Sequence, residues 1–274
     1  MTINCKGHLI DLSSPKVMGI LNITPDSFYD GGLFNSEKTI LQHVERMLTE
    51  GASFIDVGAY SSRPNANHVS EDDELKRILP IVNLIIKAFP ETLISIDTFR
   101  SNIAKHCIEA GAALINDISA GKLDENMLPT IADLNVPYIM MHMRGTPQTM
   151  QQETNYNNIV KDMLFYFSER IAAAKAMGIV DIIVDPGFGF AKTKVQNYEL
   201  LNKLELFKII DTPILVGVSR KSMIYKTLET SAKEALNGTT VLNTIALEKG
   251  ASILRVLDVK EAVECVKLVK SLST

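Results

Sequence analysis

Eight short apolar runs alternate with longer amphipathic segments along this chain of 274 residues. The amphipathic segments at 37–50, 71–88 and 258–271 have the spacing of helices that bury one face. The apolar runs are continuous, which is typical of parallel strands that are covered on both faces. These predicted strands are residues 17–22, 53–57, 93–97, 112–116, 137–143, 181–185, 213–218 and 252–256.

This alternation predicts an α/β fold, because eight strand–helix units in about 250 residues are the size of a (β/α)8 TIM barrel. An open, doubly wound sheet is the structural alternative, since eight parallel strands also form such sheets. No linker-like stretch divides the sequence, so we expect a single domain over residues 1–274. The leading segment at 2–11, with Gly7 at its centre, predicts a short N-terminal hairpin at the barrel bottom.

The charge balance excludes several classes of partner. The chain has 28 basic and 32 acidic residues and no dense basic block, so we expect it to bind neither nucleic acid nor a membrane surface. The three cysteines are far apart in sequence, which argues against a disulfide framework and fits a reducing compartment. No apolar leader and no run of about 18 apolar residues is present, and we therefore expect a cytoplasmic protein.

Polar residues stand where most of the predicted strands end. In a barrel of this type the carboxyl ends of the strands build the active site. A single Asp, Asn or Ser at such a junction is often only a helix N-cap, and Asp258 with Glu261 has the spacing of a capping box. Six or seven polar strand ends together favour a functional site. They are Asn22, Asp56, Asp97, Asn116 with Asp117, Asp185, Ser219 to Lys221, and Arg255.

Two arginines indicate a phosphorylated ligand. Arg63 follows the second predicted strand and Arg255 ends the eighth, where barrels frequently bind phosphate near a helix N-terminus. The alternative is that these arginines pair with neighbouring carboxylates. The segment 187–192 begins like a dinucleotide fingerprint but has Lys192 in place of the third glycine, so nucleotide binding of that kind is not predicted. His142 lies at a strand end without metal-type spacing, which favours a structural role.

Taken together, the strand-end segments closely resemble the dihydropteroate synthase family, over the whole chain and in the same order. The resemblance implies a pterin-binding (β/α)8 barrel, usually a homodimer, that acts with Mg²⁺ in folate biosynthesis. The implied transferase reaction joins 6-hydroxymethyl-7,8-dihydropterin diphosphate to p-aminobenzoate and releases pyrophosphate. The matching segments are Asn22–Phe28, Ser61–Pro64, Ser95–Thr98, Ile115–Asp117, Met141–Pro147, Asp185–Phe190, Ser219–Ser222 and Arg255–Val256.

The resemblance also implies roles for individual residues. Asp185 offers one carboxylate to the two adjacent N–H donors of a pterin, and Lys221 offers its ammonium to the pterin carbonyl. Asn22 is the implied Mg²⁺ ligand. Met140 lies in a methionine run that is most simply explained by strand packing, and the alternative is that it offers a soft wall to a flat ring. The expected catalytic residues are Asp97, Asp185, Lys221 and Arg255. The expected substrate-binding residues are Ser62, Arg63, Pro64, Asp97, Asn116, Met140, Asp185, Phe190, Lys221, Ser222 and Arg255.

The sequence departs from the family pattern most clearly at Leu257, where a histidine that donates to the diphosphate is usual. Ser62, Asn65 and Ala191 are more modest departures. Leu257 keeps open a pterin-binding paralogue without activity, and a methyltetrahydrofolate corrinoid methyltransferase domain is a second alternative. The loops at 26–32 and 61–67 are expected to be mobile until substrate orders them.

Overall fold

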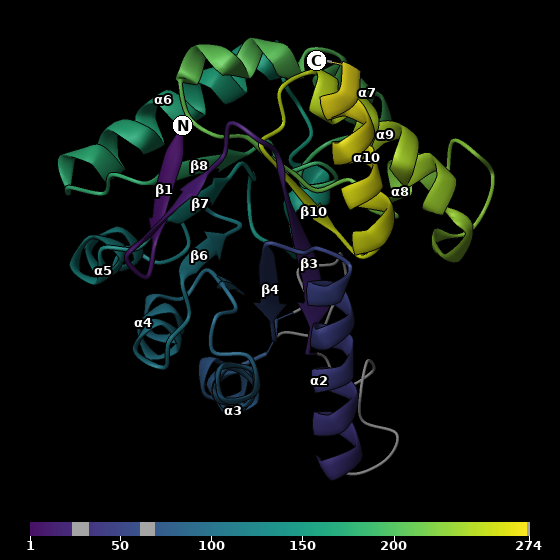
Figure 1. Cartoon of the computed structure of the whole chain (residues 1–274). Coiled ribbons are helices and arrows are strands. Elements are labelled where there is room, and N and C mark those ends of the chain that lie inside the picture. The colour runs from purple at the N-terminus through teal and green to yellow at the C-terminus, as the bar shows by residue number, and fades with distance from the viewer. Residues whose placement is uncertain (24–32, 61–68, 273–274) are drawn as a thin grey trace.

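The structure is a computed structural model that describes residues 1–23, 33–60 and 69–272, without the side chains of 33–36. Within those residues, eight parallel strands follow one another around a sheet in the order β8-β7-β6-β5-β4-β3-β10-β9 (Figure 1). The strands are β3 (Lys16–Asn22), β4 (Phe54–Gly58), β5 (Ile94–Asp97), β6 (Leu114–Asp117), β7 (Tyr138–Met141), β8 (Ile182–Asp185), β9 (Leu215–Val216) and β10 (Ile253–Val256).

The two ends of this sheet meet. A parallel bridge joins Val184 of β8 to Ile214, the residue before β9, and the Val184 N–H donates to the carbonyl of Pro213 at 3.0 Å. The sheet therefore closes into the predicted (β/α)8 barrel, and the open-sheet alternative is wrong. The prediction of a strand over 213–218 is too long, because β9 covers only Leu215–Val216 and Pro213 has no N–H for the ladder.

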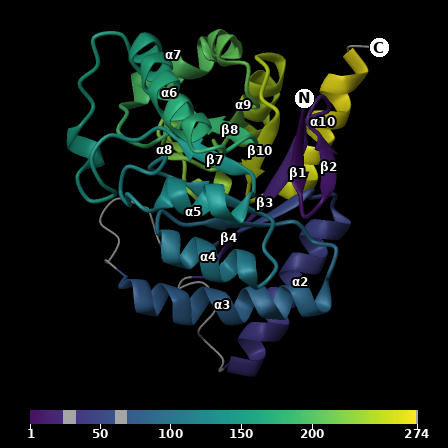
Figure 2. The ribbon, with the colours of Figure 1, turned by 90° about the vertical axis from the view of Figure 1, so that its left-hand side faces the viewer.

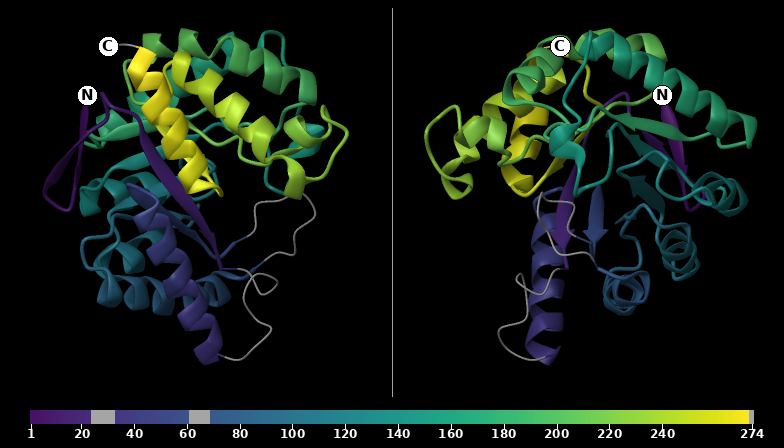
Figure 3. Two further views of the ribbon diagram at one scale, coloured as in Figure 1. Left: turned by 45° about the vertical axis from the view of Figure 1, so that its right-hand side comes forward. Right: turned by 180° about the vertical axis from the view of Figure 1, so that it is seen from behind.

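Helices cover the outside of the strands on every side that Figures 1, 2 and 3 show. The three predicted helices are present, with ends shifted by up to four residues. None of the helices in the described ranges is long and apolar enough to cross a membrane. The α-helices are α2 (Leu33–Thr49), α3 (Glu71–Ala88), α4 (Ser101–Glu109), α5 (Met127–Leu134), α6 (Ile159–Ala176), α7 (Lys194–Asn202), α8 (Ser222–Tyr225), α9 (Leu236–Glu248) and α10 (Val259–Leu272).

The amino ends of the strands enclose an apolar core inside the barrel. The predicted hairpin is present as β1 (Thr2–Cys5) and β2 (His8–Asp11), and the turn between them uses Gly7 at φ +83°. The Asn4 N–H donates to Asp181 Oδ2 at 2.8 Å, which fixes the hairpin to the start of β8. The hairpin and the barrel share one buried cluster: Ile3, Cys5, Leu12, Met18, Phe54, Ala113, Leu114, Ile139, Ile183, Leu215 and Ile253.

Candidate active site

Seven polar side chains, from six strands and the loop after β9, gather at the carboxyl end of the barrel, which we call the rim: Asn22, Asp56, Asp97, Asn116, Asp185, Lys221 and Arg255. Side chains alternate between the two faces of a strand, so those in register on parallel neighbours point the same way. Asp97 is in register with Asn116, and Asn22 is in register with Gly58. A Cβ on Gly58 would lie 3.3 Å from the Cβ of Asp97, which shows how closely β4 and β5 approach here. The strand ends therefore bring Asn22 and Asp97 to one rim, as predicted.

Arg255 of β10 is held between two carboxylates. Its Nε donates to Asp56 Oδ2 at 2.5 Å and its Nη2 donates to Asp97 Oδ2 at 2.6 Å. The amide of Asn116 donates to the same Asp56 oxygen at 3.2 Å. The alternative that Arg255 pairs with neighbouring carboxylates is confirmed. Among the residues that the structure describes, no hydrogen bond to Nη1 is formed, so this nitrogen is left for another anion. Asp56 is the residue whose importance the sequence analysis missed: it was noted as a strand end but was given no role.

The charges in this cluster do not balance, because two carboxylates share one guanidinium. Burial raises the pKa of Asp97 to about 7, the Arg255 charge opposes this shift, and the neighbouring Asp56 adds to it. Burial alone would lower the pKa of Arg255, but Asp56 and Asp97 together hold it above its ordinary value. Arg255 therefore stays charged, while Asp97 changes its protonation state near neutral pH.

Asp185 and Lys221 form the second charged pair of the rim. Burial lowers the pKa of Lys221 to about 8, and the nearby Asp185 carboxylate opposes that shift. Burial likewise raises the pKa of Asp185, against the charge of Lys221. Asp185 Oδ1 accepts a hydrogen bond of 2.7 Å from the Gly187 N–H, which fixes the orientation of the carboxylate and, as far as the described part of the chain goes, leaves Oδ2 for a ligand. The Lys221 ammonium donates to the carbonyl of Phe188.

The aromatic ring of Phe190 lies beside Lys221. Its Nζ lies 5.0 Å from the centre of the Phe190 ring, which is partly buried. Ser222 is also partly buried and begins α8, directly after Lys221. The structure thus brings Phe190 and Ser222 next to the rim, as predicted. Ser62, Arg63, Pro64 and Asn65 lie outside the described residues, as do the loops at 26–32 and 61–67 that were expected to be mobile.

Met140 packs in the barrel wall, as the simplest explanation of the methionine run predicts, and the structure does not place it at the rim. Met140 is fully buried in the core cluster that packs the strands against the helices. Its neighbour Met141 is in register with Asp185 and belongs to a separate cluster against which Phe190 packs. The strand alternation of β7 therefore places Met141 on the rim side, one position from the predicted residue.

The strand-end carboxylates Asp97 and Asp185 are not helix caps. The N-cap positions of α4, α6 and α7 are Arg100, Asn158 and Thr193, so the N-cap explanation does not apply to Asp97 or Asp185. Asp258, expected only as a cap, accepts two hydrogen bonds of 2.8 and 2.9 Å from Arg220. This ion pair ties the loop after β9 to the start of α10, which sequence spacing alone did not indicate.

Leu257 lies close to the rim without being packed into it. Its side chain is 37% exposed, and its N–H donates to Ser219 Oγ at 3.2 Å. The backbone is therefore fixed while the side chain faces solvent. A larger polar side chain at this position has room to reach an anion.

Asn22 offers a neutral oxygen for a divalent cation. It ends β3 and is partly exposed. The part of the chain that the structure describes contains no group of three His, Cys, Asp or Glu side chains able to hold a metal ion. Mg²⁺ usually keeps several waters and binds through one or two protein oxygens together with substrate phosphates, and a single amide oxygen suits that mode.

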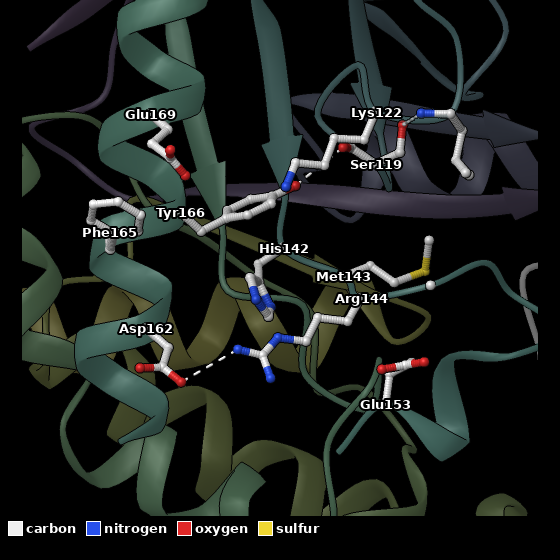
Figure 4. Close-up of a pocket in the computed structure, with 12 residues that line it drawn as sticks. Ser119, Lys122, His142, Met143, Arg144, Glu153, Asp162, Phe165, Tyr166 and Glu169 are labelled. Carbon is white, nitrogen blue, oxygen red and sulfur yellow. Dashed lines mark hydrogen bonds and ion pairs between the residues drawn. The ribbon is translucent and has the colours of Figure 1, made fainter. Parts of the chain in front are cut away.

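A cavity of about 370 Å³ lies beside the rim, between α6 and the loops after β6 and β7 (Figure 4). Asp97, Asn116, Asp185 and Lys221 do not line it, so it is separate from the candidate site. Its lining carries both signs of charge, in Lys122, Arg144, Glu153, Asp162 and Glu169.

A (β/α)8 barrel with carboxylate, ammonium and guanidinium groups at the carboxyl end of its strands has the architecture of an enzyme for polar substrates. Comparison with known proteins identifies the class. A family model described as "Pterin binding enzyme" matches residues 18–257. The chain is 42% identical over 273 residues to the dihydropteroate synthase of Escherichia coli K12, covering 99% of this chain and 96% of that protein. It is 40% identical over 258 residues to that of Bacillus subtilis, covering 93% and 88%.

Solved structures agree. The Yersinia pestis dihydropteroate synthase in a sulfonamide drug complex superposes with a TM-score of 0.93 at 40% identity, over 100% of this chain and 99% of that one. The Vibrio fischeri enzyme gives 0.88 at 43% identity, over 100% and 98%. The chain therefore belongs to the pterin-binding enzymes and, within them, to the dihydropteroate synthases, which are transferases of folate synthesis.

Proposed function

We propose that this chain joins 6-hydroxymethyl-7,8-dihydropterin diphosphate to p-aminobenzoate, giving 7,8-dihydropteroate and pyrophosphate. The observation that carries the proposal is the rim itself. There the ends of β8 and β10 and the loop after β9 bring together the Asp185 carboxylate, the Arg255 guanidinium and the Lys221 ammonium. A Xanthomonas albilineans dihydropteroate synthase solved with 4-aminobenzoic acid, 33% identical at a TM-score of 0.92, supports the second substrate.

The pterin is assigned to the charged half of the rim. Its aminopyrimidinone edge carries adjacent N–H donors, which Asp185 accepts, and a carbonyl, which Lys221 binds. Asn116 supplies both a donor and an acceptor, although its amide also bonds to Asp56. Asp97 lies on the neighbouring strand, where its carboxylate faces the positive charge that develops on the pterin methylene carbon.

The diphosphate is assigned to Arg255 through Nη1 and to Arg63, which lies outside the described residues. Asn22 would hold Mg²⁺, which when bound neutralises negative charge on the departing pyrophosphate. The bond from the methylene carbon to the diphosphate oxygen breaks, and the bond to the amine nitrogen forms, with loss of one amine proton. An aromatic amine is unprotonated at neutral pH, so the attack needs no general base, and we favour bond breaking ahead of attack.

The p-aminobenzoate is assigned to the aromatic side of the rim, against Phe190 and Ser222, with Ser62 and Pro64 outside the described residues. The Phe190 ring centre lies 5.0 Å from Lys221 Nζ, so the amine of p-aminobenzoate bound against Phe190 would lie next to the pterin. This geometry brings both reactants to one place, which is the main contribution that a displacement of this kind requires.

We also propose that the protein is a cytoplasmic homodimer. The elements α6, α7 and the 3₁₀ segment Leu204–Ile210 pack against one another and leave large apolar side chains exposed: Phe165, Val195, Leu206 and Ile209. Exposed large apolar side chains on adjoining elements are typical of an interface. Cys5, Cys107 and Cys265 are all free and buried, which is compatible with a reducing compartment. Sedimentation of Ile209→Glu against the unchanged protein tests the dimer: we expect a shift to monomer.

A pyrophosphate-release assay tests the activity. With both substrates and Mg²⁺ we expect release that depends on p-aminobenzoate, and a strong decrease after chelation of the metal. Pterin diphosphate binding without release would instead support the pterin-binding paralogue without activity, the alternative that Leu257 keeps open. Methyl transfer from methyltetrahydrofolate to a corrinoid would support the second alternative.

A further inference from the structure

Lys192 is a buried amine to which the proposed reaction gives no role. It ends the segment 187–192 that begins like a dinucleotide fingerprint, and its side chain lies at the site of the missing third glycine. It is only 4% exposed. Burying an amine without purpose is costly, so the contacts of this group need a physical explanation.

The Lys192 amine holds the segment that follows Asp185. Its Nζ donates to the carbonyls of Gly187 and Phe190, each at 2.9 Å, and lies 3.1 Å from Nδ1 of His142. An ammonium has three N–H donors, and these three acceptors match them. Burial lowers the pKa of Lys192, but a neutral amine still has two donors for the two carbonyls and accepts from His142 instead. We call this set of hydrogen bonds from Lys192 to Gly187, Phe190 and His142 the clamp. It can form whether Lys192 is charged or neutral.

His142 is the fixed support of this clamp. It is 1% exposed, and its ring meets Tyr166 edge-on with centroids 4.8 Å apart. Figure 4 shows the ring between Tyr166 and Arg144, at the edge of the cavity beside the rim. A Cβ on Gly187 would lie 2.3 Å from the His142 carbonyl oxygen, so the clamped segment fits closely against this residue.

The clamped segment reaches both halves of the candidate site. The Gly187 N–H orients the Asp185 carboxylate, while the Gly187 carbonyl is bound by Lys192. The Phe190 carbonyl is bound by Lys192, while the Phe190 ring faces Lys221. A single side chain therefore connects the residue assigned to the pterin with the residue assigned to p-aminobenzoate.

We propose that Lys192, supported by His142, is a positioning residue that keeps Asp185 and Phe190 in their binding orientations. The proposal rests on the proposed function, because it takes the two substrates from there. Without the clamp the segment must be ordered each time substrate binds, and that ordering weakens binding. The expected signature is a loss in substrate affinity that exceeds the loss in turnover.

Steady-state kinetics of Lys192→Met test this inference, because methionine keeps a similar length and removes every donor. We expect KM for p-aminobenzoate to rise about tenfold or more, the size of a lost charge-assisted hydrogen bond, with kcat changed by less than about threefold. Arg170→Met is the matched control. Arg170 also holds a loop carbonyl, that of Ala120 at 2.8 Å, but this loop follows β6 and carries none of the proposed site residues.

Two variants of His142 keep the test decisive if Lys192→Met does not fold. His142→Leu removes the acceptor for Lys192, and we expect KM for p-aminobenzoate to rise about threefold or more. His142→Asn places a polar atom near the position of Nδ1, and we expect KM to return to within about twofold of the unchanged protein.

Three results would overturn the positioning role. They are an unchanged KM in Lys192→Met, an equal rise in Arg170→Met, or a change in His142→Leu that His142→Asn does not rescue. Absence of pyrophosphate release from the unchanged protein is a different outcome and counts against the proposed function. In that case calorimetric titration with the pterin still tests the clamp, because weaker pterin binding in Lys192→Met is then expected through Asp185.

Discussion

The two ends of this barrel are built from the same strands and have opposite chemistry. At the amino end, Phe54, Leu114 and Ile253 are buried against the hairpin. Two residues further along the same strands, Asp56, Asn116 and Arg255 form a hydrogen-bonded charged cluster. Two residues is one period of a strand, so each strand presents both kinds of side chain to the same interior.

The comparison shows that the amino end of the barrel stabilises the fold, while the charged groups at the carboxyl end destabilise it. Burying one large apolar side chain contributes about 1.5–3 kcal/mol, and the amino end does this on nearly every strand. At the carboxyl end, burial raises the pKa of Asp97 and Asp185 and lowers that of Lys221, which shows that their charged forms are held at a cost. Apolar burial at the amino end offsets the cost of burying these charges, and the charges form the candidate active site at the carboxyl end.

Arg255→Ala is the change with the largest expected effect. It leaves Asp56, which is fully buried, and Asp97 without their cation, and removing one partner of a buried pair typically costs about 3–5 kcal/mol. We also expect binding of the pterin diphosphate to weaken far more than binding of p-aminobenzoate, measured by calorimetry. An equal loss for both substrates would remove Arg255 from the anion site.

Phe54→Ala tests the opposite end of the barrel. Phe54 is fully buried among the strands and the hairpin, and the cavity left by alanine typically costs about 3–5 kcal/mol. Urea unfolding measures this loss. We expect KM for both substrates to stay close to that of the unchanged protein at temperatures where the variant is folded. A change in KM as large as that of Arg255→Ala would contradict the separation of the two ends.

Leu257→His adds a donor to the polar end. The side chain is 37% exposed, so we expect little change in the free energy of unfolding. A charge-assisted hydrogen bond to the diphosphate contributes about 1.5–3 kcal/mol, which corresponds to binding tighter by roughly ten- to a hundredfold. The affinity for the pterin diphosphate is the quantity to measure. Unchanged kinetics and affinity would show that position 257 does not face the diphosphate.

The titration of Asp97 gives an effect that is spread over several pH units. Its folded pKa, about 7, lies above the unfolded value, so between about pH 4 and 7 the folded state keeps a proton that the unfolded state loses. Its contribution to stability is therefore fully present at low pH and is lost as pH rises to 7, with a slope approaching ~1.4 kcal/mol per pH unit.

Urea unfolding of Asp97→Asn and of the unchanged protein between pH 5 and 7.5 measures this contribution, because this range covers most of the titration of folded Asp97. The unchanged protein should lose stability relative to the variant as pH rises. Asp133→Asn, at an exposed carboxylate of α5, is the control and should show no such trend. Parallel curves for Asp97→Asn and the unchanged protein would contradict the assignment.

The sequence predicted the barrel and much of its rim because both depend on local patterns. Continuous apolar runs mark parallel strands, and the residue that ends each run necessarily lies at the shared edge, as Asn116 and Asp185 do. The position of Met140 could not be predicted, because a run of apolar residues does not reveal which face of the strand each one occupies. That assignment needs the register, which pairs Met141 with Asp185.

Partners distant in sequence could not be predicted. Arg255 and Asp56 are 199 positions apart, and no local pattern shows that they pair. Arg220 and Asp258 are 38 apart, and the local pattern at Asp258 indicated a helix cap instead. Lys192 was noted only as the residue in place of a motif glycine, because its partner His142 is 50 positions away and becomes a neighbour only when β7 and β8 lie side by side.

Calorimetric titration of Asp185→Asn with the pterin diphosphate tests the central claim most directly, namely that the polar end of the barrel is the pterin site. An amide at this position keeps the shape but turns an NH₂ group toward either the Gly187 N–H or the pterin donors, and both arrangements lose a hydrogen bond. We predict that binding weakens by about a hundredfold or more, with the protein still folded. Affinity equal to that of the unchanged protein would contradict the account.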